Sequence, residues 1–292
     1  MIAPRYTAPT SLADALQLKK ESGAEARVIA GGTDLILRMR DRVLSPSLLI
    51  DLRALSLGNI VLGDDELCIG TSVSLSQVLE NTDTQRLFPA LVAACREFAG
   101  PPIRNRATLG GNIANASPAA DLVPPLGAYD ARVVLRSAGG ERVLPLLEFF
   151  TGPGQSVIEP DEILTEIRLP LMPTLSAATF IKLGQRRSMA ISQVNVTTRL
   201  SIHEENVVSE VRIVLGAVAP VPMRALAAEQ IISGNALSDE LLCSAAQKAA
   251  EEIMPISDVR ASRSYRVEMT EVLVRRALFA TRDELGRNAT DG

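Results

Sequence analysis

The chain lacks most of the side chains that carry metal or nucleophilic chemistry. Its 292 residues include no tryptophan, one histidine (His203) and three cysteines, Cys68, Cys95 and Cys243. Because no two cysteines lie within four residues of each other, the chain has no CxxC pair for zinc or thiol redox chemistry and no internal iron–sulfur ligand set. A single histidine also excludes HExxH metalloprotease chemistry and every site with several histidine ligands.

Charge and hydropathy argue against nucleic acid or a membrane as the partner. The chain has 30 basic and 34 acidic residues, a formal net charge of −4, and its Lys and Arg residues form no block that could follow a phosphate backbone. No apolar stretch approaches the ~20 residues that cross a bilayer, and the first residues show no basic region followed by an apolar run. We expect a cytoplasmic protein with reduced, unpaired cysteines.

Length and residue pattern predict two domains. A chain of this size buries roughly 75% of its extended-chain surface and lies near the usual limit for a single core. Pro170, Pro173 and the short polar stretch to Ser176 form the best linker candidate. We therefore expect one domain over residues 1–175, with subdomains of about 1–57 and 58–175, and a smaller α+β domain over residues 176–292.

Periodicity and turn residues predict the elements of each domain. In the first domain we expect helices at 11–21, 34–43, 75–80, 89–98 and 120–128, strands at 27–30, 48–52, 60–63, 67–70 and 163–169, and a hairpin at 131–146. In the second we expect antiparallel strands at 177–183, 193–203 and 207–217, then helices at 223–232, 238–253 and 262–282. Residues 100–118 hold three prolines, three glycines and three asparagines, which predicts a long structured loop with a functional role.

Two short motifs share one local chemistry. The segments AGGTD (30–34) and TLGGN (108–112) each set paired glycines beside a hydroxyl or amide side chain. Glycine lets backbone N–H groups converge on an anion, and the first motif leads into an expected helix N-terminus, so each motif is a candidate phosphate cradle. The alternative is an ordinary tight turn. Neither GxGxxG after a strand nor GxxxxGK[ST] is present, so a diphosphate would be held by two separate loops.

These motifs and four further segments resemble the flavin-binding medium subunit of the molybdenum hydroxylases, the family of carbon monoxide, nicotinate and xanthine dehydrogenases. The resemblance covers nearly the whole chain, and the order and spacing of the segments agree with the family. The matching segments are YTAPTSLADAL (6–16), AGGTDLILRM (30–39), TLGGNIANASPAADLVPPL (108–126), DEILTEIRLP (161–170), FIKLGQRRSMAIS (180–192) and ASRSYRVEMTEVLVRRAL (261–278).

The resemblance implies a fold and a cofactor. The fold is α+β: a two-subdomain FAD-binding domain of the vanillyl-alcohol-oxidase (PCMH) type, then a small domain with a three-stranded antiparallel sheet and helices. Residues 28–35 would wrap the FAD pyrophosphate through main-chain N–H groups, and the second glycine motif would complete the cradle with the Thr108 hydroxyl as a further donor. The residues implied are Val28, Ile29, Ala30, Gly31, Gly32, Thr33, Asp34, Leu35, Thr108, Leu109, Gly110, Gly111 and Asn112.

Four other positions match cofactor contacts of the family. Asp121 matches an aspartate that bonds the ribose side of FAD; the alternative is a helix-start acid. Phe98 matches an aromatic residue near the adenine and Leu164 an apolar contact, although both residue types are more often core. Lys182 matches a lysine near the flavin ring, where a cation stabilises the anionic reduced flavin; the alternative is a solvated strand lysine.

No residue is expected to be catalytic or to bind a metal. His203 lies in a strand-to-turn segment far from both glycine motifs, so we expect a surface position and FAD bound without a covalent link. The resemblance places Arg186, Arg187 and Ser188 near the flavin face, with a solvated turn as the alternative.

Gly31→Val or Gly111→Val is expected to abolish FAD retention and leave the chain folded.

The implied function is electron transfer within an oxidoreductase complex. By the resemblance, this chain joins a large molybdopterin subunit and a small [2Fe–2S] subunit in a heterotrimer. Single electrons would reach FAD from the iron–sulfur partner and leave to NAD+, a quinone or another acceptor. The alternatives are a stand-alone FAD-dependent oxidoreductase of the same fold and an assembly subunit that has lost its flavin. Intact glycines in both motifs argue against that loss.

Overall fold

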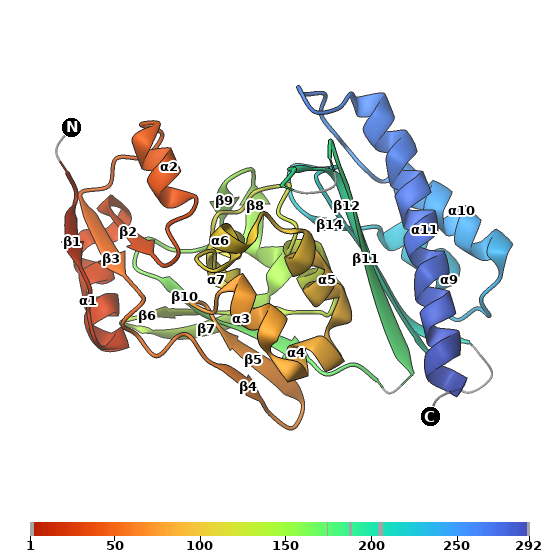
Figure 1. The fold of residues 1–292 in the computed structure, drawn as a ribbon, viewed down its shortest axis with the longest axis horizontal. Coiled ribbons are helices and arrows are strands. Elements are labelled where there is room, and N and C mark those ends of the chain that lie inside the picture. The colour runs from red at the N-terminus through yellow and green to blue at the C-terminus, as the bar shows by residue number, and fades with distance from the viewer. Residues whose placement is uncertain (1–2, 174, 187–188, 204–206, 291–292) are drawn as a thin grey trace.

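The computed structural model describes residues 3–173, 175–186, 189–203 and 207–290, and three larger sheets follow one another across the molecule (Figure 1). The first sheet is parallel, in the order β1-β3-β2, and consists of β1 (Arg5–Thr7), β2 (Ala26–Ile29) and β3 (Leu48–Asp51). Helix α1 (Leu12–Ser22) connects β1 to β2, and both strands pair in parallel with β3, which lies between them. Ser11 caps α1 by accepting the Asp14 N–H, and Gly23 ends the helix with a φ of 50°.

The second sheet is antiparallel and holds five strands in the order β4-β5-β10-β6-β7. Its strands are β4 (Ile60–Leu62), β5 (Glu66–Gly70), β6 (Arg132–Ser137), β7 (Gly140–Pro145) and β10 (Ile163–Pro170). Short helices pack with this sheet around one apolar core: α3 (Leu75–Glu80), α4 (Thr82–Leu87), α5 (Pro89–Glu97), α7 (Leu109–Ala114) and α8 (Val123–Ala128). A further short helix, α6 (Pro101–Arg104), contacts α3 outside this core. A small hairpin, β8 (Phe150–Gly152) and β9 (Gln155–Ser156), lies beside them.

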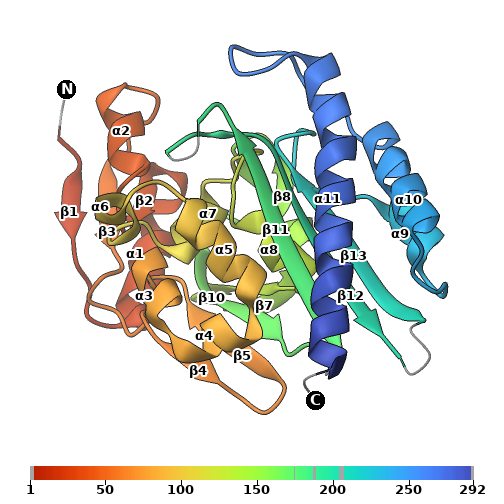
Figure 2. The same cartoon turned by 45° about the vertical axis from the view of Figure 1, so that its right-hand side comes forward.

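The third sheet is covered on both faces. Its strands are β11 (Ser176–Gly184), β12 (Ser192–Ile202), β13 (Val208–Gly216) and β14 (Met223–Arg224). The long helix α11 (Arg263–Thr290) packs on the outer face, beside α10 (Asp239–Glu251) and α9 (Leu226–Ile232), while α5 and α8 pack on the inner face (Figure 2). As a result every residue of β12 is buried, including its polar ones.

The α+β class and the order of the domains follow the expectation, but the third sheet has four strands rather than three. Residues 223 and 224, expected to begin a helix, instead pair with Leu215 and Val214 of β13. This pairing covers part of the edge of β13, and the Arg224 guanidinium binds the buried Glu229 carboxylate one helical turn into α9. The helix therefore begins at Leu226.

The structure also corrects the expectation of a loop at 100–118, because this segment contains the two short helices α6 and α7. Pro101 and Pro102 occupy the first turn of α6, where a missing N–H costs nothing. Thr108 caps α7 by accepting the Gly111 N–H at 3.0 Å. Helix α4 and the hairpin β8–β9 were not expected, and α2 (Leu35–Arg40) and α8 are shorter than expected, whereas α11 is longer.

The longest helix, α11, carries charged residues along its length and packs against β11, β12 and α10. Its inward face includes the buried Leu273, Val274, Ala277 and Leu278. Within the described part of the chain, no helix is both long enough and apolar enough to cross a membrane.

Charged side chains join the third sheet to the rest of the molecule. Asp130, at the end of α8, accepts hydrogen bonds from Arg199 Nη2 and Arg212 Nε, each at 2.8 Å. The Arg199 side chain is only 4% exposed, so its charge depends on Asp130 and on Glu210, which also lies 2.8 Å away. These ion pairs fix α8 against β12 and β13.

We expect Asp130→Asn to lower the free energy of unfolding by about 1–3 kcal/mol, because it leaves a nearly buried arginine with one partner fewer. Asparagine keeps the size of the side chain and tolerates the left-handed backbone of this position, where φ is 54°. Urea denaturation measures the change. Asp64→Asn is the control, since Asp64 is exposed and no described residue pairs with it. Equal stability of both variants would show that the ion pairs contribute nothing.

Candidate cofactor-binding site

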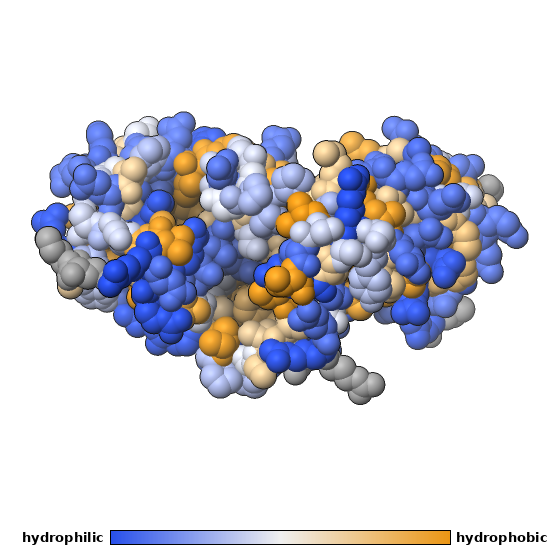
Figure 3. Space-filling view, turned by 90° about the horizontal axis from the view of Figure 1, so that it is seen from above, coloured by the Kyte–Doolittle hydropathy of each residue, from blue (hydrophilic) through white to orange (hydrophobic). Residues whose placement is uncertain are grey.

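A cavity of about 790 Å³ lies where the first sheet, the α6–α7 segment and residues 189–191, which precede the third sheet's β12, meet. Its volume falls within the usual range for small-molecule and cofactor sites. Seen from above, the surface is hollowed between the N-terminal part at the left and the centre of the molecule (Figure 3). All of the expected cofactor-binding residues line this cavity except Leu109, which is fully buried in the core, and Lys182.

The first glycine loop packs directly against the backbone of residues 106 and 107. A Cβ on Gly31 would overlap with the carbonyl group of Arg106, so only glycine fits this approach. Gly32 has a φ of 73°, a left-handed conformation that other side chains rarely adopt. Sequence reasoning attributed both glycines to an anion, whereas the structure shows that Gly31 is also required by packing.

The N–H groups of this loop are available to a ligand. No described residue accepts a hydrogen bond from the backbone N–H of Gly31, Gly32, Thr33 or Asp34, and all four residues line the cavity. Gly31, Gly32 and Thr33 are half-buried and Asp34 is exposed. Half-buried N–H groups without a partner are unfavourable, and a run of four consecutive donors is suited to an anion.

The second glycine loop uses its N–H groups within the chain. The Gly110 N–H donates to the Thr71 carbonyl at 3.2 Å, the Gly111 N–H to Thr108 Oγ1 at 3.0 Å and the Asn112 N–H to the Thr108 carbonyl at 3.0 Å. A Cβ on Gly110 would overlap with Thr71. This loop therefore presents side chains, rather than backbone donors, to the cavity.

Two of those side chains have unused hydrogen-bonding capacity. Asn112 Oδ1 is buried and has no hydrogen-bond partner among the described residues. Thr108 Oγ1 accepts one bond, and no acceptor for its own proton lies within the described structure. An amide group and a hydroxyl group facing four backbone donors fit a polar, anionic ligand such as a diphosphate.

Asp121 and Lys182 form a buried ion pair at the end of the cavity nearest the third sheet. Lys182 Nζ lies 2.6 Å from Asp121 Oδ2, and the two side chains are 6% and 8% exposed. Asp121 Oδ1 accepts a second bond from Ser192 Oγ at 2.5 Å and a third from Asn195 Nδ2 at 3.2 Å. Sequence reasoning found both charged residues but not their pairing, because 61 positions separate them.

Phe98 lies at this same end. The preceding residue, Glu97, is close enough to Lys182 and Asp121 for both charges to act on its carboxyl group, whose pKa is raised by burial. A Cβ on Gly100 would lie 3.6 Å from Met189 Sδ, which lines the cavity beside β12. Phe98 is therefore near Lys182, although the family resemblance assigned Phe98 to the adenine and Lys182 to the flavin ring. Leu164 is 4% exposed and packs in the core with one side on the cavity.

Sequence reasoning missed several polar residues of the lining, and three of them are cations, Lys19, Arg27 and Arg38. Lys19 Nζ donates to the carbonyls of Gly23, Ala26 and Pro160, and burial together with the nearby Arg27 charge lowers its pKa. The available signal was its position on the apolar side of its helix, with Ala15 and Leu16. Arg38 Nη1 bonds Asn115 Oδ1 at 3.2 Å and borders the cavity at α2.

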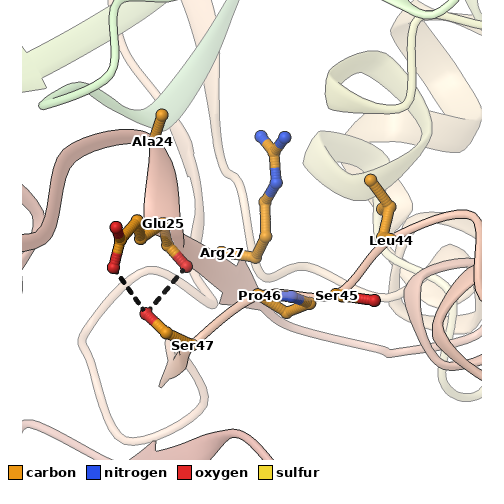
Figure 4. Close-up of a pocket in the computed structure, with 7 residues that line it drawn as sticks. All are labelled: Ala24, Glu25, Arg27, Leu44, Ser45, Pro46 and Ser47. Carbon is orange, nitrogen blue, oxygen red and sulfur yellow. Dashed lines mark hydrogen bonds between the residues drawn. The ribbon is translucent and has the colours of Figure 1, made fainter.

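A second cavity, of about 500 Å³, adjoins the first at the β2 side. The two share Ala24, Arg27 and Leu44 in their lining. Arg27 points into the space between Ala24 and Leu44, and Ser47 donates to the Glu25 backbone and side chain at its edge (Figure 4). The cofactor cavity thus continues past Arg27, away from Asp121.

The remaining expectations concern residues outside the cavity lining. His203 is exposed at the end of β12, as expected, and its N–H donates to the Val207 carbonyl at 3.0 Å. Arg186 Nη2 donates to the Met189 carbonyl at 2.8 Å, while Arg187 and Ser188 lie outside the described residues. Across the described ranges no group of three His, Cys, Asp or Glu side chains is arranged to hold a metal ion.

Two family models together match most of the chain. The model for the FAD binding domain in molybdopterin dehydrogenase matches residues 2–172, and the model for the CO dehydrogenase flavoprotein C-terminal domain matches residues 179–281. The chain is 33% identical over 276 residues to the putative xanthine dehydrogenase FAD-binding subunit of Escherichia coli, covering 94% of each. It is 32% identical to the carbon monoxide dehydrogenase medium chain of Hydrogenophaga pseudoflava, covering 96% of this chain and 98% of that one.

Solved structures agree with these matches. A chain of the carbon monoxide dehydrogenase from Hydrogenophaga pseudoflava superposes with a TM-score of 0.91 at 31% identity, covering 96% of this chain and 98% of that chain. A chain of quinoline 2-oxidoreductase from Pseudomonas putida gives a TM-score of 0.91 at 26% identity, covering 97% and 98%.

The contacts of the two glycines predict losses of stability of different size for their alanine variants. Gly31→Ala should lower the free energy of unfolding by about 3 kcal/mol, because its Cβ meets backbone that no rotamer change can move. The same contact argues against the expectation that valine at Gly31 leaves the fold intact. Gly111→Ala should lower stability by about 1 kcal/mol, since its Cβ meets only Thr108 Oγ1, at 2.9 Å, and displaces that capping oxygen, while alanine favours the helix. Urea denaturation compares them, and equal losses would refute the packing difference.

Proposed function

Because the chain belongs to the FAD-binding medium subunits of the carbon monoxide, xanthine and nicotinate dehydrogenase family, an oxidoreductase family, we propose that it holds FAD non-covalently in the 790 Å³ cavity as an electron-transfer subunit. Its partners would be a molybdopterin large subunit and a [2Fe–2S] small subunit. The bound cofactor supplies the electron transfer itself, in from the iron–sulfur partner and out to NAD+, a quinone or another acceptor.

One observation carries the assignment of the cavity. Four consecutive N–H donors, on Gly31, Gly32, Thr33 and Asp34, have no described partner and line the same cavity as Thr108 and Asn112. A diphosphate accepts from all four donors, and the Thr108 hydroxyl can donate to it from the opposite wall. Asn112 Oδ1 is closed off from the cavity, so the part of the amide group that can bind the ligand is its nitrogen, which donates.

The residues at the two ends of the cavity support a direction for the cofactor. Phe98 is the one aromatic side chain among the described residues of the lining, and it lies at the Asp121 end, where a flat ring system could pack on it. The other end is bordered by Lys19, Arg27 and Glu159. We assign the flavin half to the Phe98 end and the adenosine half to the Arg27 end, which moves Phe98 from the adenine to the flavin.

Lys182 would act on the flavin half through the wall of the cavity. Its charge is offset by Asp121 at 2.6 Å, so the pair contributes a dipole rather than an isolated cation. The proposed division at residue 175 is supported by the family models, of which the first ends at residue 172 and the second begins at 179.

Asn112→Ala tests the proposed cavity. Losing one buried hydrogen bond should weaken FAD binding about tenfold. The variant should be no less stable than the natural chain without FAD, since the asparagine amide oxygen has no described partner and alanine favours helix α7. Asn105→Ala is the matched control, an exposed asparagine outside the lining.

Fluorescence titration with FAD measures the affinities, and mixing the loaded chain with the reduced [2Fe–2S] partner should bleach the oxidised-flavin absorbance. Restoring that absorbance with NAD+ or with a quinone identifies the acceptor. A chain that binds no FAD favours the assembly subunit, and a loaded chain that its iron–sulfur partner cannot reduce favours the stand-alone enzyme.

A further inference from the structure

The carboxylate of Asp121 has nearly all of its hydrogen-bonding capacity filled by the third sheet. A carboxylate oxygen accepts about two hydrogen bonds. Oδ1 has two donors, Ser192 Oγ at 2.5 Å and Asn195 Nδ2 at 3.2 Å, whereas Oδ2 has one, Lys182 Nζ at 2.6 Å. One acceptor position therefore remains, on Oδ2, and Asp121 lines the cofactor cavity.

The donors cannot easily move. Ser192 is 1% exposed and Asn195 0% exposed, and both belong to β12, which pairs with β11 on one side and β13 on the other. Three donors from two adjacent strands thus set both the position and the rotation of a carboxyl group that belongs to the other domain. Without Ser192, Oδ1 would keep only the longer bond from the Asn195 amide and Oδ2 only the bond from Lys182, so the carboxyl group would turn more freely about its Cβ–Cγ bond.

We infer that Ser192 and Asn195 are positioning residues of the cofactor site: they act through Asp121, holding its Oδ2 so that the remaining acceptor position meets a hydroxyl of the flavin half of FAD. This inference rests on the proposed function. It gives the third sheet an indirect part in cofactor binding, because neither Ser192 nor Asn195 of β12 lines the cavity.

The inference predicts a selective loss of affinity. Ser192→Ala should weaken FAD binding about tenfold, because Asp121 Oδ2, no longer held in place, would lose its hydrogen bond from the FAD hydroxyl. It should leave the affinity for ADP unchanged, because ADP fills only the diphosphate and adenosine part of the cavity, toward Arg27. Ser192→Thr keeps the hydroxyl donor and should restore most of the FAD affinity. Asn195→Ala should give a smaller loss, since its bond to Asp121 is longer.

Asp130→Asn is the matched control, because Asp130 also joins α8 to the third sheet through ion pairs and lies outside the cavity lining. It should be less stable than the natural chain and bind FAD equally well. Fluorescence titration of FAD and competition by ADP, with the 292-residue chain, give the affinities.

The outcomes separate the inference from the proposed function. If the natural chain binds FAD and Ser192→Ala binds it equally well, the positioning role is refuted and the proposed function stands. If Ser192→Ala weakens ADP and FAD by the same factor, or if Asp130→Asn weakens FAD as much, the effect is a general loosening of the domains and the positioning role is again refuted. If the natural chain binds no FAD, the positioning role and the proposed function are both refuted.

Discussion

The close approach of the Gly31 backbone to the Arg106 carbonyl is the contact on which the cavity depends. It brings a loop of the first sheet against the segment that leads into α7, with no side chain between them. Gly110 makes a similar approach to Thr71, and Gly70 to the Leu57 backbone. Gly31 and Gly70 meet backbone, whereas Gly110 meets first the side chain of Thr71, and at Gly31 the N–H groups of the first loop stay uncovered by side chains.

The second constraint is the burial of β12 on both faces. A strand covered by helices on both sides is usually apolar, yet β12 carries serine, asparagine, threonine and arginine. Each of these needs a partner in the interior, because an unpaired buried polar group is costly. Two aspartates of the α8 region supply most of these partners. Asp130 accepts hydrogen bonds from arginines, and Asp121 accepts them from Ser192, Asn195 and, on β11, Lys182. The same partners that join the domains therefore close one end of the cavity.

Sequence patterns predicted most elements that depend on local chemistry. Ser11 and Gly23 bound α1 as their residue types indicate, and the hairpin of β6 and β7 turns where a glycine pair stands. The two glycine motifs and Asp121 came to one cavity as the family resemblance implied. What escaped prediction depends on contacts between distant segments. Residues 223 and 224 became strand because β13 had a free edge beside them, and the proline- and asparagine-rich segment formed helices because Thr108 and two prolines start them.

Amide hydrogen exchange measures most directly whether the first glycine loop holds the cofactor diphosphate. The N–H groups of residues 31–34, which have no described acceptor, should exchange quickly in the chain alone and slowly once FAD is bound. The N–H groups of Gly110 and Gly111 are already bonded within the chain and should change far less. Unchanged exchange at residues 31–34 in a chain saturated with FAD would contradict this assignment of the site.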